Sequence, residues 1–223
     1  MLADPGRATL PGPDAARLKN VLCHQVLSGL HAPGARLCAA QVERSHHVSA
    51  ADVRDAFAAL AAEGLLRLTG DDAVVPHIDA ARLAEVDEVR RGLQEVTIRR
   101  FVRRASPAQR AAVRAAAERF RTLVDSAASS PAALREAYEW FYYLLLRAAG
   151  GRNTVDLLLT LREEIGLTMA TGLHGPGRAA SVADELNAIV AAMEANDVAR
   201  AVEVADAHLD ALSRSALHFS RAR

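Results

Sequence analysis

Apolar residues recur every three or four positions through most of the chain after residue 80, with polar residues between them. This spacing is typical of helices that bury one face. It predicts six helices, near residues 80–104, 107–126, 131–149, 154–171, 181–195 and 198–219. Serine-proline pairs at 106–107 and 130–131 are typical helix starts, and Asp197 can cap the last helix. Because the breaks between helices are short, we expect an antiparallel bundle.

The first part of the chain carries shorter helical patterns. Asp14 can cap a first helix, and a short second helix is expected over residues 39–45. Ser49 and Asp52 have the spacing of a capping box, which predicts the start of a third helix. Gly64 stands where this helix needs a left-handed C-terminal residue.

Two apolar segments, 65–68 and 73–78, flank Gly70-Asp71-Asp72, a pattern typical of a β-hairpin. Three helices followed by a hairpin predict a winged helix-turn-helix over residues 14–79, in which a short helix can reach the major groove of DNA. Residues 1–13 contain no apolar segment and predict a flexible arm rather than a signal peptide. The expected fold class is therefore mainly α: a winged helix-turn-helix with a small β-hairpin wing, then an all-helical bundle over residues 80–223.

Composition agrees with this class. Alanine occupies 48 of the 223 positions and aromatic residues are 4%, which favours helices over sheets. Cys23 and Cys38 are too few for a disulfide framework, so we expect reduced thiols and a cytoplasmic protein. No apolar run is long enough to span a membrane, and no membrane partner is expected. The formal net charge of zero gives no overall basic excess that would indicate nucleic acid.

An ordered set of short motifs resembles the GntR family of bacterial transcription regulators, FadR subgroup, over nearly the whole chain from about residue 18. These motifs are Pro33-Gly34-Ala35-Arg36-Leu37, Val48-Ser49, Val53-Arg54-Asp55-Ala56-Phe57, Leu60-Ala61-Ala62-Glu63-Gly64-Leu65, Glu88-Val89-Arg90, Trp140-Phe141-Tyr142, and Asn196-Asp197 with His208 eleven residues later. Each motif alone is weak, but their order along the chain is specific.

The resemblance implies a homodimeric regulator that binds double-stranded DNA. Its N-terminal domain would read an inverted-repeat operator, while its helical domain would dimerise and bind a small molecule, usually a carboxylic acid. Carried over by position, Arg36, Arg44, Ser49 and Arg54 would contact DNA. Arginine can bind phosphates or guanine edges, and Ser49 lies at a helix N-terminus that favours phosphate.

Several positions depart from the family pattern. The family usually has glycine where this chain has His47, arginine at Ala50, and a basic, glycine-rich wing tip at Gly70-Asp71-Asp72. Residues 1–79 contain seven basic and nine acidic residues. Carboxylates at the wing tip would repel phosphates, so we expect DNA binding to be weaker or more sensitive to salt than in the family. The alternative is a helical interaction or scaffold protein with a degenerate DNA-binding domain.

Many members of the resembled family hold a divalent metal in the helical domain, through an aspartate and three histidines. The corresponding places hold Tyr138, Tyr142, Leu186 and His208 here. One imidazole and two neutral phenols are a poor set of ligands for zinc or nickel, so we expect no metal and no other cofactor.

The same residues suggest how a ligand binds without metal. Tyr138 and Tyr142 share a helix face and, with His208, offer hydroxyl and imidazole hydrogen bonds in an apolar bundle. Arg90, if it points inward, adds a forked cation suited to a carboxylate. The alternative is that the tyrosines are core aromatics and Arg90 is a surface charge. No nucleophile motif, metalloprotease motif or phosphate-binding loop occurs, so an enzyme is not expected.

Overall fold

The computed structural model describes residues 12–27, 30–77, 79–126, 131–150, 154, 156–157, 173 and 177–221. The chain forms two compact units, which divide between His77 and Ile78. No helix in the described residues is both long and apolar enough to cross a membrane.

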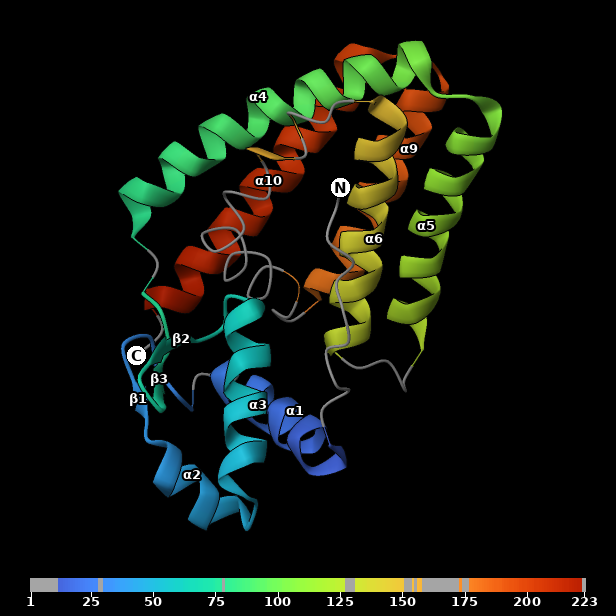
Figure 1. The fold of residues 1–223 in the computed structure, drawn as a ribbon. Helices are drawn as coiled ribbons and strands as arrows, with labels where there is room; N and C mark the ends of the chain where they lie inside the picture. Colours follow the sequence, from blue (N-terminus) through green and yellow to red (C-terminus); the bar gives the residue numbers. More distant parts are fainter. Residues whose placement is uncertain are drawn as a thin grey trace. The chain divides into compact units, whose positions relative to one another are not determined.

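The N-terminal unit consists of helices followed by a small sheet (Figure 1). Its elements are α1 (Pro13–Leu27), β1 (Arg36–Leu37), α2 (Ala39–His46), α3 (Ala50–Ala62), β2 (Arg67–Thr69) and β3 (Asp72–Val74). The three strands are antiparallel in the order β1-β3-β2. The fold class predicted from the sequence is confirmed, and β1 adds a strand to the expected hairpin. The core of this unit includes Leu18, Leu22, Val26, Val53, Phe57, Leu60 and Leu65.

The turn between α2 and α3 explains one departure from the family pattern. His47 follows α2 and adopts the left-handed conformation, with φ of 53°, which glycine adopts at no steric cost. Ser49 then caps α3 with the predicted capping box, and Gly64 has a φ of 74° after the end of α3. The prediction for Asp14 was wrong, because α1 begins at Pro13 and Asp14 lies in its first turn.

The sequence pattern also misplaced the wing tip by one residue. Asp72 is the first residue of β3, where it pairs with Thr69, so the turn consists of Gly70 and Asp71. The side chain of Asp72 is only 16% exposed. Only one of the two carboxylates expected at the wing tip therefore lies in the turn.

The C-terminal unit contains α4 (Ala80–Arg104), α5 (Pro107–Asp125), α6 (Pro131–Ala149), α9 (Arg178–Glu194) and α10 (Val198–Arg221) (Figure 1). Except for residues 154 and 156–157, the predicted helix over 154–171 lies outside the described residues. Ser106 caps α5 in a capping box with Gln109, and Asp197 accepts a hydrogen bond from the backbone of Arg200 at 2.9 Å. Both caps agree with the sequence pattern.

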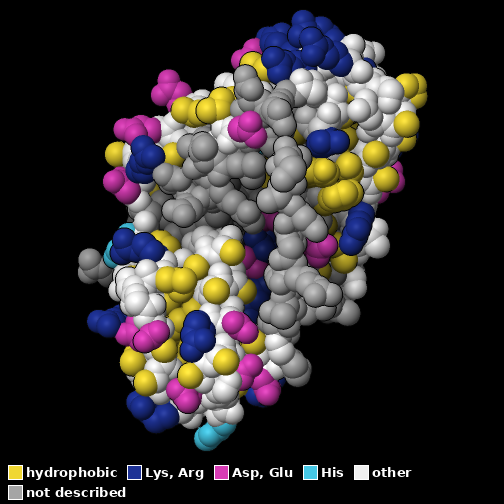
Figure 2. Space-filling model, viewed as in Figure 1, with side chains coloured by type: hydrophobic (Ala, Val, Ile, Leu, Met, Phe, Trp, Pro, Cys, Tyr) yellow, Lys and Arg dark blue, Asp and Glu magenta, His cyan; other side chains and the backbone are white. Residues whose placement is uncertain are grey.

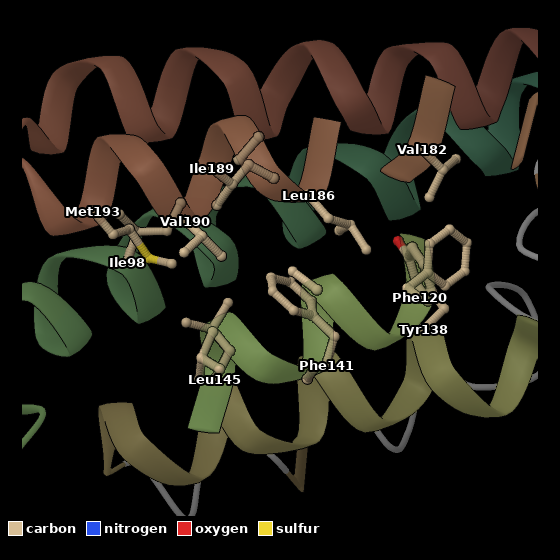
Figure 3. Packing of buried hydrophobic residues seen from close by; sticks show 14 of the residues in the cluster. Ile98, Phe120, Tyr138, Phe141, Leu145, Val182, Leu186, Ile189, Val190 and Met193 are labelled. Carbon is tan, nitrogen blue, oxygen red and sulfur yellow. The ribbon is translucent and has the colours of Figure 1, made fainter. Parts of the chain in front are cut away.

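The core of this unit lies between its helices and is almost entirely apolar. Figure 3 shows large side chains of α5, α6 and α9 meeting there. Buried residues of this cluster include Ile98, Phe120, Phe141, Leu145, Val182, Leu186, Ile189 and Met193. Burial of each large apolar side chain contributes about 1.5–3 kcal/mol, so this core fixes the helices around the polar groups described below.

Candidate functional sites

Helix α3 of the N-terminal unit presents one capped end and one exposed arginine. The Ser49 hydroxyl accepts the backbone N–H of Asp52 at 3.2 Å and donates to the Asp52 carboxylate at 2.5 Å. Arg54 on α3 and Arg44 on α2 are exposed, and neither forms an ion pair with another described residue. Both guanidinium groups can therefore reach an external anion, whereas the Ser49 hydroxyl is committed to its cap.

Arg36 has a partner within the protein. Its Nε and Nη2 atoms donate to Oδ2 of Asp72 at 3.0 and 2.7 Å, and Oδ1 of Asp72 accepts the backbone N–H of Ala39 at 2.8 Å. The hydrogen bond from Ala39, and then that from Arg36, lower the pKa of Asp72 below its ordinary value. Asp72 is therefore an ionised carboxylate, paired with Arg36, that joins β1, β3 and the start of α2.

Charge is mixed on the visible face of the N-terminal unit. Figure 2 shows basic and acidic side chains interspersed there, without a continuous basic stripe. This agrees with the seven basic and nine acidic residues in the first 79. Contacts to an anion from this unit depend on individual arginines rather than on a broad positive field.

The helical unit contains a chain of hydrogen-bonded polar groups, which we call the relay: the buried Tyr138 and His208 and the half-buried Glu185 and Arg178. The Tyr138 hydroxyl lies 2.7 Å from Nε2 of His208, and Nδ1 of His208 lies 2.5 Å from Oε2 of Glu185. Arg178 donates to both oxygens of Glu185, at 2.9 and 3.1 Å. The relay joins α6, α10 and α9.

The electrostatics of the relay fix its hydrogen-bond directions. Burial opposes ionisation of Glu185, but hydrogen bonds from His208 and Arg178 together outweigh it and lower its pKa. Burial also lowers the pKa of His208, whose side chain is fully buried, so the ring is neutral. Because the Glu185 carboxylate can only accept, Nδ1 of His208 donates to it and Nε2 accepts the Tyr138 hydroxyl. Burial raises the pKa of Tyr138 well above its ordinary value, which keeps that hydroxyl a donor.

Tyr142 lies beside the relay without being part of it. Its ring centroid is 4.8 Å from that of Tyr138 and 6.4 Å from that of His208. Its hydroxyl donates to Oε1 of Gln94 on α4 at 3.5 Å, a long hydrogen bond, and burial raises its pKa to about 12. Nε2 of Gln94 is buried and has no hydrogen-bond partner among the described residues. Tyr142 is only partly buried, so its hydroxyl is less committed than that of Tyr138.

Arg90 is buried and not a surface charge, which rules out one of the two interpretations of its sequence position. Its Nη1 atom donates to Oδ1 of Asp87 at 3.1 Å, and Asp87 also accepts the hydroxyl of Ser213 on α10. The positive charge of Arg90 lies close enough to lower the pKa values of Tyr138 and Tyr142 against the effect of burial. The structure thus brings Tyr138, Tyr142 and His208 together, with Arg90 nearby.

The four places at which many members of the resembled family hold metal carry Tyr138, Tyr142, Leu186 and His208 in this chain. Leu186 is fully buried and points from α9 into the apolar core (Figure 3). Both ring nitrogens of His208 are already hydrogen-bonded. Over the residues that the structure describes, no group of three His, Cys, Asp or Glu side chains could hold a metal ion. Two neutral phenols, a leucine and an engaged imidazole do not suit a transition metal.

The sequence did not reveal Glu185, Arg178 and Gln94. Glu185 directly precedes Leu186 on a predicted helix. A charged residue next to the core-facing side of that helix was the one feature of the sequence that could have indicated its role. The pair Asp87 and Arg90 was detectable from its i,i+3 spacing, which is typical of helical ion pairs.

Two surface features of the helical unit lie outside these groups. Trp140 and Tyr143 stack at 5.2 Å on the outer face of α6, next to a hollow of about 480 Å³ lined also by Arg119, Glu136, Ala137 and Glu139. Figure 2 shows Lys and Arg side chains gathering at one end of this unit, and Arg103 and Arg104 lie in the last turn of α4. Basic residues at a helix C-terminus stabilise its dipole, which accounts for this cluster.

The neutral state of His208 makes stability depend on pH. In the unfolded chain this histidine takes up a proton near its ordinary pKa of 6.5, whereas the folded ring resists protonation. We therefore expect the free energy of unfolding to be highest above pH 6.5 and to fall as the pH decreases from there toward the lowered pKa of the folded state. Urea unfolding at pH 8, 7, 6 and 5.5 measures this.

His208→Gln is expected to flatten this dependence, because glutamine can keep both hydrogen bonds but does not titrate. His218→Gln is the matched control, since His218 is exposed on the same helix. Equal slopes for the wild type and His208→Gln would contradict the assignment of a neutral buried ring.

The chain matches a known family and known folds. The FCD domain model matches residues 85–211, which is more than half of the chain. A comparison with curated proteins gives no match.

Among solved structures, the chain is similar to E. coli McbR/YncC, with a TM-score of 0.56 and 17% identity over 88% of this chain and 93% of that one. It is also similar to Lar, which controls the expression of the Listeria monocytogenes agr system, with a TM-score of 0.55 and 17% identity over 92% of this chain and 96% of that one. A putative transcriptional regulator GntR from Rhodococcus sp. RHA1 matches with a TM-score of 0.54 and 19% identity over 94% and 99%.

These similarities cover both units, and at such identities they concern the fold. Together with the FCD match, they place the winged helix-turn-helix and the helical bundle in one known architecture. The chain therefore belongs to the FCD group of the GntR family of transcriptional regulators, a family of regulators rather than enzymes.

Proposed function

We propose that this protein binds double-stranded DNA through its N-terminal domain, residues 14–79, and senses a small organic acid through its helical domain, residues 80–223. The observation that carries the proposal is the capped end of α3, which is held by α1 and α2 and carries Arg54, which is exposed and forms no ion pair with a described residue. The protein would act in the cytoplasm as a homodimer on an inverted repeat, because two identical reading helices recognise two-fold symmetric DNA.

The DNA contacts would come from a few arginines. Arg54 lies in the second turn of α3, from which a guanidinium can donate two hydrogen bonds to a guanine edge. Arg44 and Arg36 would contact phosphates, and the backbone N–H groups at Ser49 would favour a phosphate near the helix start. Asp71 in the wing turn opposes these contacts and would weaken binding, while the arginine–phosphate contacts would make binding dependent on salt.

The effector would bind beside the relay without a metal. Arg90 would supply positive charge for a carboxylate, while Tyr142 and His208 flank the same region from α6 and α10. Tyr138 is already bonded to His208 and would shape the site rather than bind the acid directly. A ligand that contacts α4, α6 and α10 would favour one arrangement of these helices, and so shift the dimer between DNA-binding and non-binding states.

The first test is selection of duplex DNA by the purified protein at low salt, followed by affinity measurements at rising salt. Recovery of an inverted repeat supports a regulator, and neighbouring genes then suggest the pathway of the acid. If no sequence is enriched with or without candidate acids, the DNA-binding proposal fails and the scaffold alternative is favoured.

Tyr142→Phe tests the effector site. Small carboxylic acids are screened by the rise in melting temperature, with the corresponding amides as neutral controls. For the acid that stabilises most, the variant is expected to bind at least about 10-fold more weakly, because a hydrogen bond to a charged group contributes roughly 1.5 kcal/mol or more. Protein stability should change little, since the hydrogen bond from the hydroxyl to Gln94 is long and its other hydrogen-bond contact is with the Tyr138 hydroxyl, which also bonds to His208.

Tyr143→Phe is the matched control for this experiment. Tyr143 follows Tyr142 in the sequence but is 47% exposed on the other face of α6. Equal affinities of the two variants for the acid would remove Tyr142 from the site.

A further inference from the structure

We propose that Asp72 is a positioning residue for DNA binding, which holds Arg36 in the orientation that contacts a phosphate. This inference rests on the proposed DNA-binding function. It assigns a favourable role to a wing carboxylate that charge alone would count as repulsive.

The geometry joins three segments through one carboxylate. Oδ2 of Asp72 accepts two hydrogen bonds from Arg36 on β1, and Oδ1 accepts the first backbone N–H of α2, from Ala39. Asp72 itself is paired in the sheet with Thr69 of β2. The base of the wing is thereby fixed to the start of the helix pair that presents α3.

The guanidinium of Arg36 remains available on its other side. The Arg36 side chain is 70% exposed, while that of Asp72 is 16% exposed beneath it. Its Nη1 atom makes no hydrogen bond to any described residue. Because Asp72 binds the Nε and Nη2 edge, the remaining N–H groups are aimed outward in a fixed plane. A planar fork with fewer accessible rotamers loses less entropy when it binds a phosphate.

If the Asp72 carboxylate is neutralised, the positioning role and simple electrostatics predict opposite changes in the affinity for DNA. If Asp72 only added negative charge, its neutralisation would strengthen binding to DNA. If it orients Arg36, the same neutralisation frees the guanidinium and weakens binding. Asp71 provides the matched case, since it lies in the wing turn, is exposed and has no described partner.

The experiment compares Asp72→Asn with Asp71→Asn, by measuring affinity for the selected duplex over a range of salt concentrations. Asp72→Asn is expected to weaken binding about 5- to 10-fold and to reduce the slope of log affinity against log salt by about 0.9, the loss of one phosphate contact. Asp71→Asn is expected to strengthen binding without that loss of slope. A defect in folding alone would lower the active fraction but leave the slope unchanged.

If Asp72→Asn folds poorly, the affinity of Arg36→Lys for the same duplex tests the proposal instead. Lysine retains the charge but cannot form the two-bonded fork, so it should weaken binding to a similar degree. Stronger binding by Asp72→Asn, or unchanged binding by Arg36→Lys, would overturn the role of Asp72. If the wild type binds no duplex at all, the proposed function itself fails, and this role fails with it.

Discussion

Arg54→Ala is expected to remove most of the sequence preference of DNA binding. The exposed guanidinium lies one turn beyond the capped start of α3 and has no described partner, so the substitution breaks no internal ion pair. A two-bonded contact to a base contributes about 1–3 kcal/mol of discrimination, which corresponds to roughly 5- to 150-fold in affinity. Affinity for the selected operator should fall by about this factor, while affinity for a scrambled duplex falls little.

The control for this result is Arg17→Ala. Arg17 lies on α1 of the same unit, its side chain is 66% exposed, and within the described part of the chain it pairs only with Asp14, three residues earlier. Arg17→Ala removes the same charge at a different place. It therefore distinguishes the loss of a specific contact from a general loss of positive charge. An equal loss on both duplexes for Arg54→Ala would make Arg54 a phosphate contact, and no loss on either would remove it from the interface.

The local features of the fold were predictable because local chemistry decides them. The capping boxes at Ser49 and Ser106 depend on residues three positions apart, and the structure contains both. Helix α4 begins and ends where the apolar spacing predicts. At its start, the Asp79 side chain accepts hydrogen bonds from two backbone N–H groups. In each case the sequence carries the donor, the acceptor and the spacing.

The features that the sequence did not predict depend on residues far apart in the chain. Strand β1 has only two residues, and it forms because it pairs with β3 in the sheet. The bond between Arg36 and Asp72 spans 36 positions, and the one between Tyr138 and His208 spans 70. No local pattern encodes such pairs. A charge count therefore treated Asp72 as repulsive, although its partner neutralises it.

The same argument separates the two interpretations of the helical domain's polar residues. Tyr138 has a satisfied hydroxyl and is buried, as the core interpretation requires. Tyr142 is partly exposed, and its hydroxyl makes a long hydrogen bond to Gln94 and a hydrogen-bond contact with Tyr138, so it keeps a capacity to bind a ligand. Two tyrosines that look equivalent in the sequence thus differ through contacts with other helices.

Glu185→Ala is expected to lower the free energy of unfolding by about 3 kcal/mol. Glu185 accepts hydrogen bonds from Arg178 and from the fully buried His208, and their side chains are 15% and 0% exposed. Removing the carboxylate leaves the Nδ1–H donor of the fully buried His208 without its acceptor and removes the ion pair that the partly buried Arg178 forms with Glu185. A buried donor without a partner costs about 1–3 kcal/mol, and more if it is charged. Urea unfolding at pH 7.5, where the carboxylate is ionised, measures the loss.

Asp184→Ala provides the comparison within the same turn of α9. Asp184 is 77% exposed and pairs with Arg121 at the surface, where an ion pair contributes at most about 1 kcal/mol. If both substitutions lower the free energy of unfolding equally, Glu185 would contribute no more to stability than a surface ion pair does. If Glu185→Ala is the costly one, the interior of the bundle depends on a charge held by Arg178. The loss of unfolding free energy for Glu185→Gln should then lie between those for the two alanine variants, since an amide still accepts one hydrogen bond but supplies no charge for Arg178.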